Sequence, residues 1–151
     1  MDNEEYLWRM VNEHMTQARH QEILRTSMTT LLVTISGAIV GVIIFDKELN
    51  RTDLAPAILL IFLRIFGVLF SAKHYERFNF HIARVRLYRS ALEKALDEKL
   101  FTQLRRDADA QHKGKFPWLV KQRQHRLWLI LHGVNAAFGI ALSAIIIIRW
   151  H

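Results

Sequence analysis

The sequence contains no cysteine, and its 151 residues include only six glycines and two prolines. Without cysteine the chain cannot form disulfides, a cysteine-bearing zinc site, a thiolate nucleophile or an iron–sulfur cluster. The scarcity of glycine and proline leaves little material for tight turns, which favours long helices over short strands. We therefore expect an all-α protein.

Charge is absent from long stretches of the chain, because the apolar residues gather in three blocks, at residues 27–45, 54–72 and 127–149. Each block approaches the ~20 residues that a helix needs to cross ~30 Å of hydrocarbon. The only charges inside the blocks are Arg64, near the middle of the second, and Arg149, at the end of the third. A soluble protein of this length could not cover three such helices with amphipathic ones. The blocks predict an integral membrane protein with three transmembrane helices.

The basic residues are distributed unevenly between the segments that join these blocks. Seventeen of the twenty-one Lys and Arg residues lie in residues 1–26 and 73–126. The positive-inside rule assigns these two segments to the cytoplasm, which makes residues 46–53 a short outer hairpin and places the C-terminus outside. The aromatic residues expected at the membrane surfaces are Tyr75 and Trp128 on the inner side and Trp150 on the outer side.

The cytoplasmic segments predict a helical lobe. Residues 2–26 favour a helix that continues into the first span, because no Gly or Pro intervenes. Residues 73–112 also lack Gly and Pro and carry an apolar stripe at three- and four-residue steps. We expect this stripe to pack on the 2–26 helix or on a neighbouring subunit, with Glu93 on the solvated face.

The reach of the chain limits the shape of this lobe. A straight helix of about 40 residues would extend ~60 Å from the membrane, whereas the return segment, residues 113–126, spans at most ~45 Å. We therefore expect the region to fold back near residues 97–102 or to lie along the membrane surface. The next helix is expected to begin near Pro117, since proline suits a first helical turn.

Arg64 is the most informative residue of the spans, because a charge at mid-membrane costs about 2.5–3.5 kcal/mol on insertion scales. No Asp or Glu lies in any span to neutralise it. Its candidate partners are backbone carbonyls, Thr34 and Ser36 of the first span, Asn135 of the third, or water. One interpretation is a polar lumen formed by several copies and ringed by Arg64, which would favour anions or gate conduction. The other is a charge that reaches to one interface or was introduced as a variant.

Small residues in the spans indicate helix contacts. Gly37 and Gly41 form a GxxxG pair in the first span, and Gly139 and Ser143 form a similar pair in the third. Such pairs let helix backbones approach closely within or between subunits, although small residues also fall at this spacing by chance. Because three helices alone leave considerable packing freedom, we favour a homo-oligomer.

His132 lies one turn from Asn135 in the inner half of the third span. We interpret it as a helix–helix hydrogen-bond partner, with a proton relay as the alternative. The remaining histidines are scattered and predict no metal site. The sequence has no nucleophile motif, no glycine-rich phosphate loop and no carboxylate pair in a plausible cleft, so we expect neither an enzyme nor a cofactor.

The basic lobe has three candidate uses. Topology and contact with the anionic lipid bilayer account for its charge most simply. A second use is to bind a cytoplasmic protein partner or an anionic signal such as a nucleotide messenger. The sequence contains no nucleic-acid-binding motif, so we expect no direct contact with nucleic acid. The residues to test for anion or partner binding are Arg84, Arg86, Arg89, Arg105 and Arg106.

The layout of the chain resembles the small bacterial SLATT-type membrane effectors of conflict and defence systems. The resemblance is carried by the 2–26 helix, the spans at residues 27–45 and 54–72, and the sequence FHIARVRLY at residues 80–88. It covers roughly two-thirds of the chain, and the third span, at residues 127–149, departs from the two-span pattern. It implies a protein of the bacterial inner membrane that oligomerises and permeabilises that membrane when a cytoplasmic sensor fires.

These features predict a small oligomeric inner-membrane effector in anti-phage defence. Its basic cytoplasmic helices would receive a signal or partner, and its spans would then alter membrane permeability. The alternative is a non-conducting membrane anchor or regulatory subunit that recruits a cytoplasmic complex. A transporter subunit is disfavoured, because three spans are few and no pair of broken helices is evident.

Overall fold

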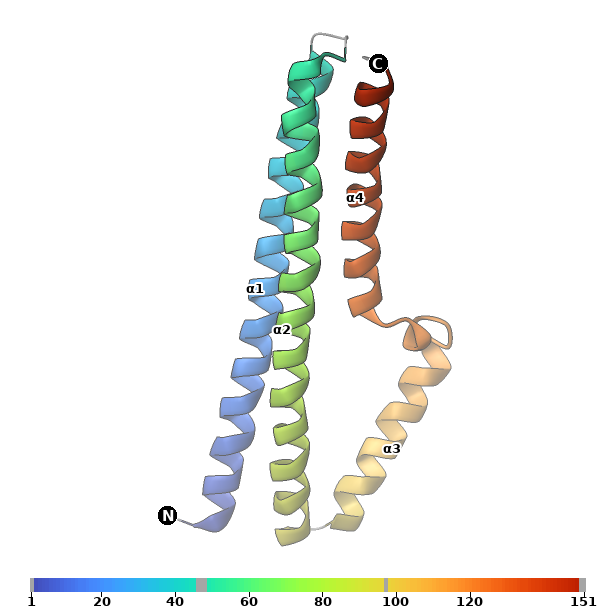
Figure 1. The fold of residues 1–151 in the computed structure, drawn as a ribbon. Coiled ribbons are helices and arrows are strands. Elements are labelled where there is room, and N and C mark those ends of the chain that lie inside the picture. The colour runs from blue at the N-terminus through green and yellow to red at the C-terminus, as the bar shows by residue number, and fades with distance from the viewer. Residues whose placement is uncertain (1, 46–48, 97, 150–151) are drawn as a thin grey trace. The chain divides into compact units, whose positions relative to one another are not determined.

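The computed structural model describes residues 2–45, 49–96 and 98–149. Within these residues the chain forms four α-helices and two short 3-10 helices and contains no strand, which confirms the expected all-α class. The element order is α1 (Asn3–Phe45), η1 (Arg51–Asp53), α2 (Leu54–Ala95), α3 (Glu98–Lys115), η2 (Leu119–Lys121) and α4 (Gln124–Arg149) (Figure 1). Residues 46–48, which are part of the expected outer hairpin, lie outside the described residues. Residue 97 and Trp150 lie outside them as well.

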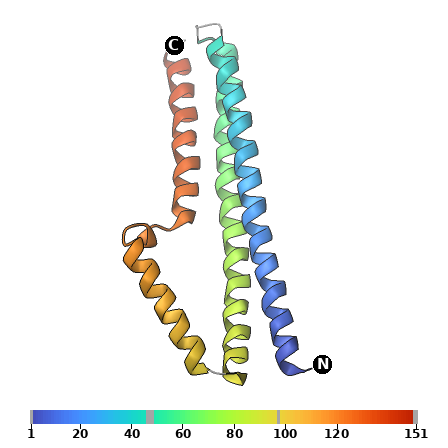
Figure 2. The same ribbon diagram turned by 180° about the vertical axis from the view of Figure 1, so that it is seen from behind.

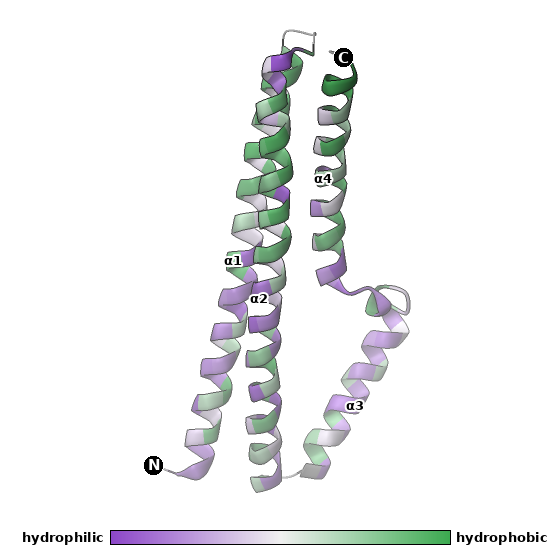
Figure 3. Cartoon of the chain, in the orientation of Figure 1, coloured by the Kyte–Doolittle hydropathy of each residue, from purple (hydrophilic) through white to green (hydrophobic). Residues whose placement is uncertain are grey.

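Three helical stretches are long and apolar enough to cross a membrane: α1, the stretch Arg51–Ala95, and α4. They contain the three apolar blocks of the sequence and are consistent with a multi-pass membrane protein. The apolar residues are concentrated in α4 and in one half each of α1 and α2, whereas α3 is largely polar (Figure 3). The 43 residues of α1 form one continuous helix, so the N-terminal segment and the first span are not separated by a break.

The chain divides into two compact units. The polar unit consists of Met1–Glu22 and Tyr75–Gln124, and the apolar unit consists of Ile23–His74 and His125–His151. In both units the segments of α1 and α2 lie side by side, as opposite views of the ribbon show (Figures 1 and 2). The third helix of the polar unit is α3, and that of the apolar unit is α4.

The helices of the apolar unit pack along faces whose buried residues recur at three- and four-residue steps. This spacing keeps one face of each helix turned toward its neighbours. The face is rich in small and polar side chains rather than in large apolar ones, most of which are exposed on the outside of the unit. The buried residues are Arg25, Thr29, Leu32, Ser36 and Ile43 of α1, Ala57, Leu60, Arg64, Gly67 and Ser71 of α2, and His132, Gly139, Ser143 and Ile146 of α4.

A hydrogen-bonded turn leads into α2. The backbone N–H of Asn50 donates to the Asp53 carboxylate at 2.7 Å, and the N–H of Asp53 donates to the Asn50 carbonyl at 3.0 Å. Pro56 follows within the first turn of α2, where its missing N–H has no intrahelical acceptor to lose. The chain thus starts its second long helix without a broken hydrogen bond.

The polar unit is a three-helix arrangement, because α2 ends at Ala95 and α3 begins at Glu98. An Arg105 guanidinium nitrogen bonds the Glu93 carboxylate, which lies twelve residues earlier in the chain. In one straight helix those residues would be about 18 Å apart along the axis, so α3 folds back on α2. Leu100 and Leu104 of the expected stripe remain half exposed.

The helix expected to begin near Pro117 begins instead at Gln124. α3 ends at Lys115, and the segment that follows closes into η2 before α4 starts. Proline is compatible with the first turn of a helix but does not by itself start one. The N–H groups of Val120, Lys121 and Gln122 donate to carbonyls three or four residues back and form a compact turn in place of a helix.

Candidate functional site

Arg64 lies inside the packed face of the apolar unit, with only 1% of its surface exposed. Its Nη2 atom donates a hydrogen bond of 3.3 Å to the backbone carbonyl of Leu32 on α1. Among the described residues, Nε and Nη1 of Arg64 have no hydrogen-bond partner. The guanidinium therefore lies between the helices of the unit and is not exposed on the outside of this chain.

His132 of α4 is fully buried and packs against a glycine of α2. A Cβ atom placed on Gly67 would lie 2.6 Å from both Cε1 and Nδ1 of the His132 ring and 3.0 Å from Leu32 Cδ1. Gly67 thus provides the space that the imidazole occupies. Neither ring nitrogen of His132 has a partner in the described part of the chain, so the expected interhelical hydrogen bond is not formed there.

Two serine hydroxyls add to this set of buried polar groups. Ser36 and Ser71 are 3% and 1% exposed, and within the described residues neither Oγ atom has a hydrogen-bond partner. Ser71 lies two turns from Arg64 on the same face of α2. A polar group buried without a partner costs on the order of 1–3 kcal/mol. With Arg64 and His132 the two serines make four buried side chains that have unpaired polar atoms within the described residues, and buried water is the usual partner of such atoms.

The other predicted partners of Arg64 lie elsewhere. Thr34 is exposed on the outside of α1. The amide of Asn135 donates to the carbonyl of Leu131, 2.7 Å away on its own helix. Of the candidates named from the sequence, the partner found for Arg64 is a backbone carbonyl.

The two small-residue pairs occupy different environments. A Cβ atom on Gly139 would lie 3.1 Å from Ile61 Cγ1 and 3.4 Å from the Ala57 carbonyl oxygen, so α4 and α2 approach closely there. The Ser143 hydroxyl donates to the Gly139 carbonyl at 2.9 Å. Nothing described lies within 4 Å of a Cβ on Gly37 or Gly41, which are exposed on α1.

Arg25 is a buried residue that the sequence reasoning missed. It is 2% exposed in the apolar unit, and its guanidinium carbon lies 5.7 Å from the centre of the Trp128 ring. A cation over an indole face at this distance is a favourable contact. The spacing of Arg25, Thr29 and Leu32, at four- and three-residue steps, is the sequence signal that places them on one face of α1.

Glu93 organises the polar unit and is not on a solvated face as the sequence suggested. Its residue surface is 8% exposed. Arg89 Nε lies 2.9 Å from one carboxylate oxygen, and Arg105 bonds the other. These hydrogen bonds, that from Arg105 first, hold the pKa of Glu93 below its usual value despite the opposing effect of burial. The expectation was wrong because α3 folds back and covers this face of α2.

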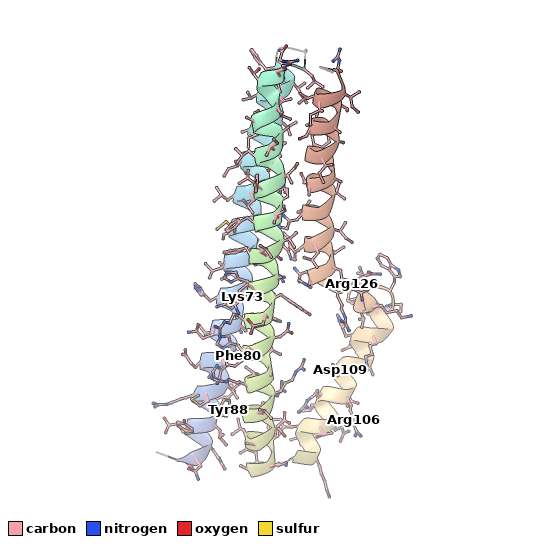
Figure 4. All side chains as sticks on the ribbon, viewed as in Figure 1. Lys73, Phe80, Tyr88, Arg106, Asp109 and Arg126 are labelled. Carbon is pink, nitrogen blue, oxygen red and sulfur yellow. The ribbon has the colours of Figure 1, made fainter. Side chains whose placement is uncertain are left out.

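The five arginines proposed for anion binding are therefore not equivalent. Arg89 and Arg105 converge on Glu93, so an anionic ligand would have to compete with that carboxylate. The Arg84 guanidinium lies over the Phe80 ring of its own helix, 4.3 Å from the ring centre. Arg106 is exposed on α3 (Figure 4). Arg86 is exposed on α2, and neither of these two arginines has an ion-pair partner among the described residues.

A histidine pair links α1 and α2 in the polar unit. The Nδ1 atoms of His14 and His81 are 3.1 Å apart, and the His14 ring stacks on Tyr88 with centroids 5.6 Å apart. One Nδ1 must donate and the other accept, so the contact requires at least one neutral imidazole. Burial, the charge of His14 and that of Arg84 lower the pKa of His81. This contact could not be predicted from the spacing of the histidines, because the two residues are 67 positions apart in the chain.

A cleft of about 400 Å³ opens in the polar unit between α1, α2 and α3. Its lining is mostly apolar and includes the polar residues Asn12, Arg19, Arg89 and Glu93. The cleft could take an elongated ligand or side chain with an apolar body and a charged end. The apolar lining residues are Trp8, Val11, Met15, Val85, Leu92, Leu96 and Phe101.

Comparisons with known protein families, with curated proteins and with solved structures found no match for this chain. In the described part of the chain, no group of three or more metal-ligating side chains is placed to hold a metal ion.

Proposed function

We propose that the protein is a small oligomeric effector of the bacterial inner membrane, with its N-terminus in the cytoplasm, that alters membrane permeability after its polar unit receives a signal or partner. Its layout, which resembles that of SLATT-type effectors, suggests a role in anti-phage defence. The proposal assigns the apolar unit to the membrane and the polar unit to the cytoplasm, in keeping with the positive-inside rule.

The observation that carries the proposal is the buried polar core of the apolar unit. Arg64 has one backbone carbonyl to satisfy five N–H donors, and His132 has no partner among the described residues. A packing that leaves such groups unmet in hydrocarbon is expensive, whereas one that admits water satisfies them. This supports two alternative packings of the helices, one closed and one hydrated.

The trigger for the change in packing lies in the polar unit. Glu93 holds α2 and α3 together through Arg89 and Arg105. An anionic ligand or partner that binds these arginines would release Glu93 and weaken the contact between α2 and α3. A ligand shifts such an equilibrium by the difference between its affinities for the two states. Because α1 and α2 extend through both units, a change in the polar unit has a continuous helical route to the spans.

Self-association is supported by the exposed pair Gly37 and Gly41. Their side of α1 presents an open backbone surface in a helix apolar enough to cross a membrane. Small residues at this spacing let two helices approach closely in lipid. The pair Gly139 and Ser143 is already used within the chain, so Gly37 and Gly41 are the surface we assign to contacts between copies.

Ion and dye release from liposomes tests the proposal. The full-length protein is reconstituted and flux is followed with and without an activating partner. Arg64→Met keeps the unbranched volume but removes the donors, so we expect release to fall at least tenfold. Ile65→Met makes the same kind of change at an exposed neighbour and should leave release unchanged. No release from the unaltered protein in any oligomeric state would refute a permeability function.

A non-conducting anchor or regulatory subunit remains the alternative function. In that function Arg64 would be a packing residue only, consistent with its 1% exposure inside the unit. In that case charge reversal at exposed Arg86 and Arg106 would abolish recovery of a cytoplasmic partner while membrane localisation and impermeability persist. The two functions therefore differ in the flux measurement.

A further inference from the structure

We propose that the turn at residues 116–120, between α3 and α4, is an interfacial membrane anchor that inserts its apolar side chains among the headgroups of anionic lipids. This inference depends only on α4 entering the membrane and not on whether the protein conducts. It adds a lipid-binding site to the polar unit.

The turn exposes an unusual concentration of large apolar side chains. Trp118 is 68% exposed, Leu119 57%, Val120 42% and Phe116 37%. They stand within five consecutive residues, and none of them belongs to the described cleft. An apolar cluster of this kind in water marks a surface that is covered in the assembled state.

The chemistry around the turn selects lipid as the covering partner. No acidic residue occurs after Asp109, while basic residues flank the turn on both sides. The Lys115 ammonium lies 5.6 Å from the Phe116 ring centre, so cationic and apolar groups are interleaved. Tryptophan flanked by basic residues suits the headgroup region of an anionic leaflet. The flanking basic residues are Lys113, Lys115, Lys121, Arg123 and Arg126.

The connection to α4 fixes where the turn must lie. Val120 precedes Gln124, the first residue of α4, by four positions, which limits their separation to ~14 Å. A candidate span that starts this close holds the turn at the membrane surface whatever the placement of the two units. The inner surface is the one to which the positive-inside rule assigns this segment.

Hydrogen bonds within the turn also suit its backbone to a less polar environment. The N–H groups of Val120, Lys121 and Gln122 donate to the carbonyls of Phe116, Trp118 and Leu119 at 3.0–3.1 Å. Pro117 has no N–H group to satisfy. Entry of backbone into the interface is costly when its polar groups are unpaired, and the closed turn reduces this cost.

The absence of cysteine from the chain permits a direct test. An environment-sensitive fluorophore is attached to the full-length variants Leu119→Cys and Ala108→Cys, where Ala108 is an exposed residue of α3 outside the turn. Both are reconstituted in vesicles of phosphatidylcholine and phosphatidylglycerol in equal parts. We expect lipids with a nitroxide near the headgroup to quench the label at position 119 several-fold more than the label at position 108. Lys121→Gln with Arg123→Gln should reduce this difference in anionic vesicles.

Three outcomes would overturn the proposal. The two labels could be quenched equally by the lipid nitroxide, or both could be fully accessible to an aqueous quencher. The label at position 119 could also be shielded from the aqueous quencher yet unaffected by the labelled lipid, which would show that protein covers the turn. Val120→Cys, at a neighbouring position, repeats the measurement if the first variant folds poorly.

Discussion

Replacement of Gly67 by alanine should destabilise the apolar unit through a single steric contact. The added Cβ would lie 2.6 Å from two atoms of the His132 ring, where ordinary contacts begin at 3.4 Å. The ring must therefore move by nearly 1 Å, and it has little room because His132 is fully buried. Overpacking of this kind costs about 1–3 kcal/mol. Alanine is the better helix former by about 1 kcal/mol, which partly masks this cost.

Gly133→Ala provides the matched control, since nothing described lies within 4 Å of a Cβ there and the residue is also helical. It gains the same helix propensity without the clash. The difference between the free energies of unfolding of the two variants should therefore be about 1–3 kcal/mol. We would measure it by reversible detergent denaturation of the full-length protein in mixed micelles, followed by circular dichroism.

The His132→Ala background shows whether Gly67→Ala destabilises the protein through its clash with the His132 ring or in some other way. With the imidazole removed, the nearest remaining contact of the added Cβ is the flexible end of Leu32 at 3.0 Å, so the cost of Gly67→Ala should largely disappear. The coupling between the two substitutions in a double-mutant cycle should then match the clash. The reasoning is refuted if Gly67→Ala costs as much in the His132→Ala background as in the unaltered protein.

Three further predictions concern the polar unit and self-association. Glu93→Gln should lower the stability of the polar unit by about 1–2 kcal/mol in thermal unfolding, a modest loss because both arginine partners are about half exposed. The lowered pKa of His81 means that its contribution is complete above about pH 6.5 and is lost as the pH falls through the lower folded value, since the unfolded chain takes up the proton first. His81→Gln should flatten this part of the stability profile, and an unchanged profile would exclude the contact with His14 as its cause. Gly37→Leu with Gly41→Leu should reduce chemical crosslinking between copies in membranes without unfolding the monomer, and undiminished crosslinking would place the interface elsewhere.

The sequence predicted the helices well because their signals are local. Charge-free apolar blocks and the absence of helix breakers are visible in any window of the chain, and they mark α4 and the apolar halves of α1 and α2. The start of α4 was misplaced, because Pro117 is compatible with a helix start but the turn at residues 116–120 competes with it. Side-chain hydrogen bonds and backbone turns of this kind depend on geometry that residue spacing does not specify.

Most contacts of the candidate sites could not be predicted from the sequence, because they join residues that are far apart in the chain. A fold-back near residues 97–102 was expected, but residue spacing does not show which face of α2 it covers, so the burial of Glu93 against Arg105 was not predicted. The histidine pair joins residues 67 positions apart. Arg64 was recognisable from its type and depth, since an isolated charge in an apolar block stands out, but its carbonyl partner on α1 was one of several candidates.

The position of Arg64 bears on the choice between an effector and an anchor. A charge at mid-membrane costs about 2.5–3.5 kcal/mol, and a hydrogen bond to a charged group returns about 1.5–3 kcal/mol. One bond of 3.3 Å to the Leu32 carbonyl is long, so it returns the lower part of that range. A non-conducting anchor has no use for a buried arginine that destabilises its packing, because an apolar side chain of similar volume would fill the same space without this cost. A helix bundle that must open to water does gain from it, because hydration of the guanidinium lowers the free energy of the open packing relative to the closed one. The stabilisation of the open packing by hydration of Arg64 therefore favours the effector over the anchor.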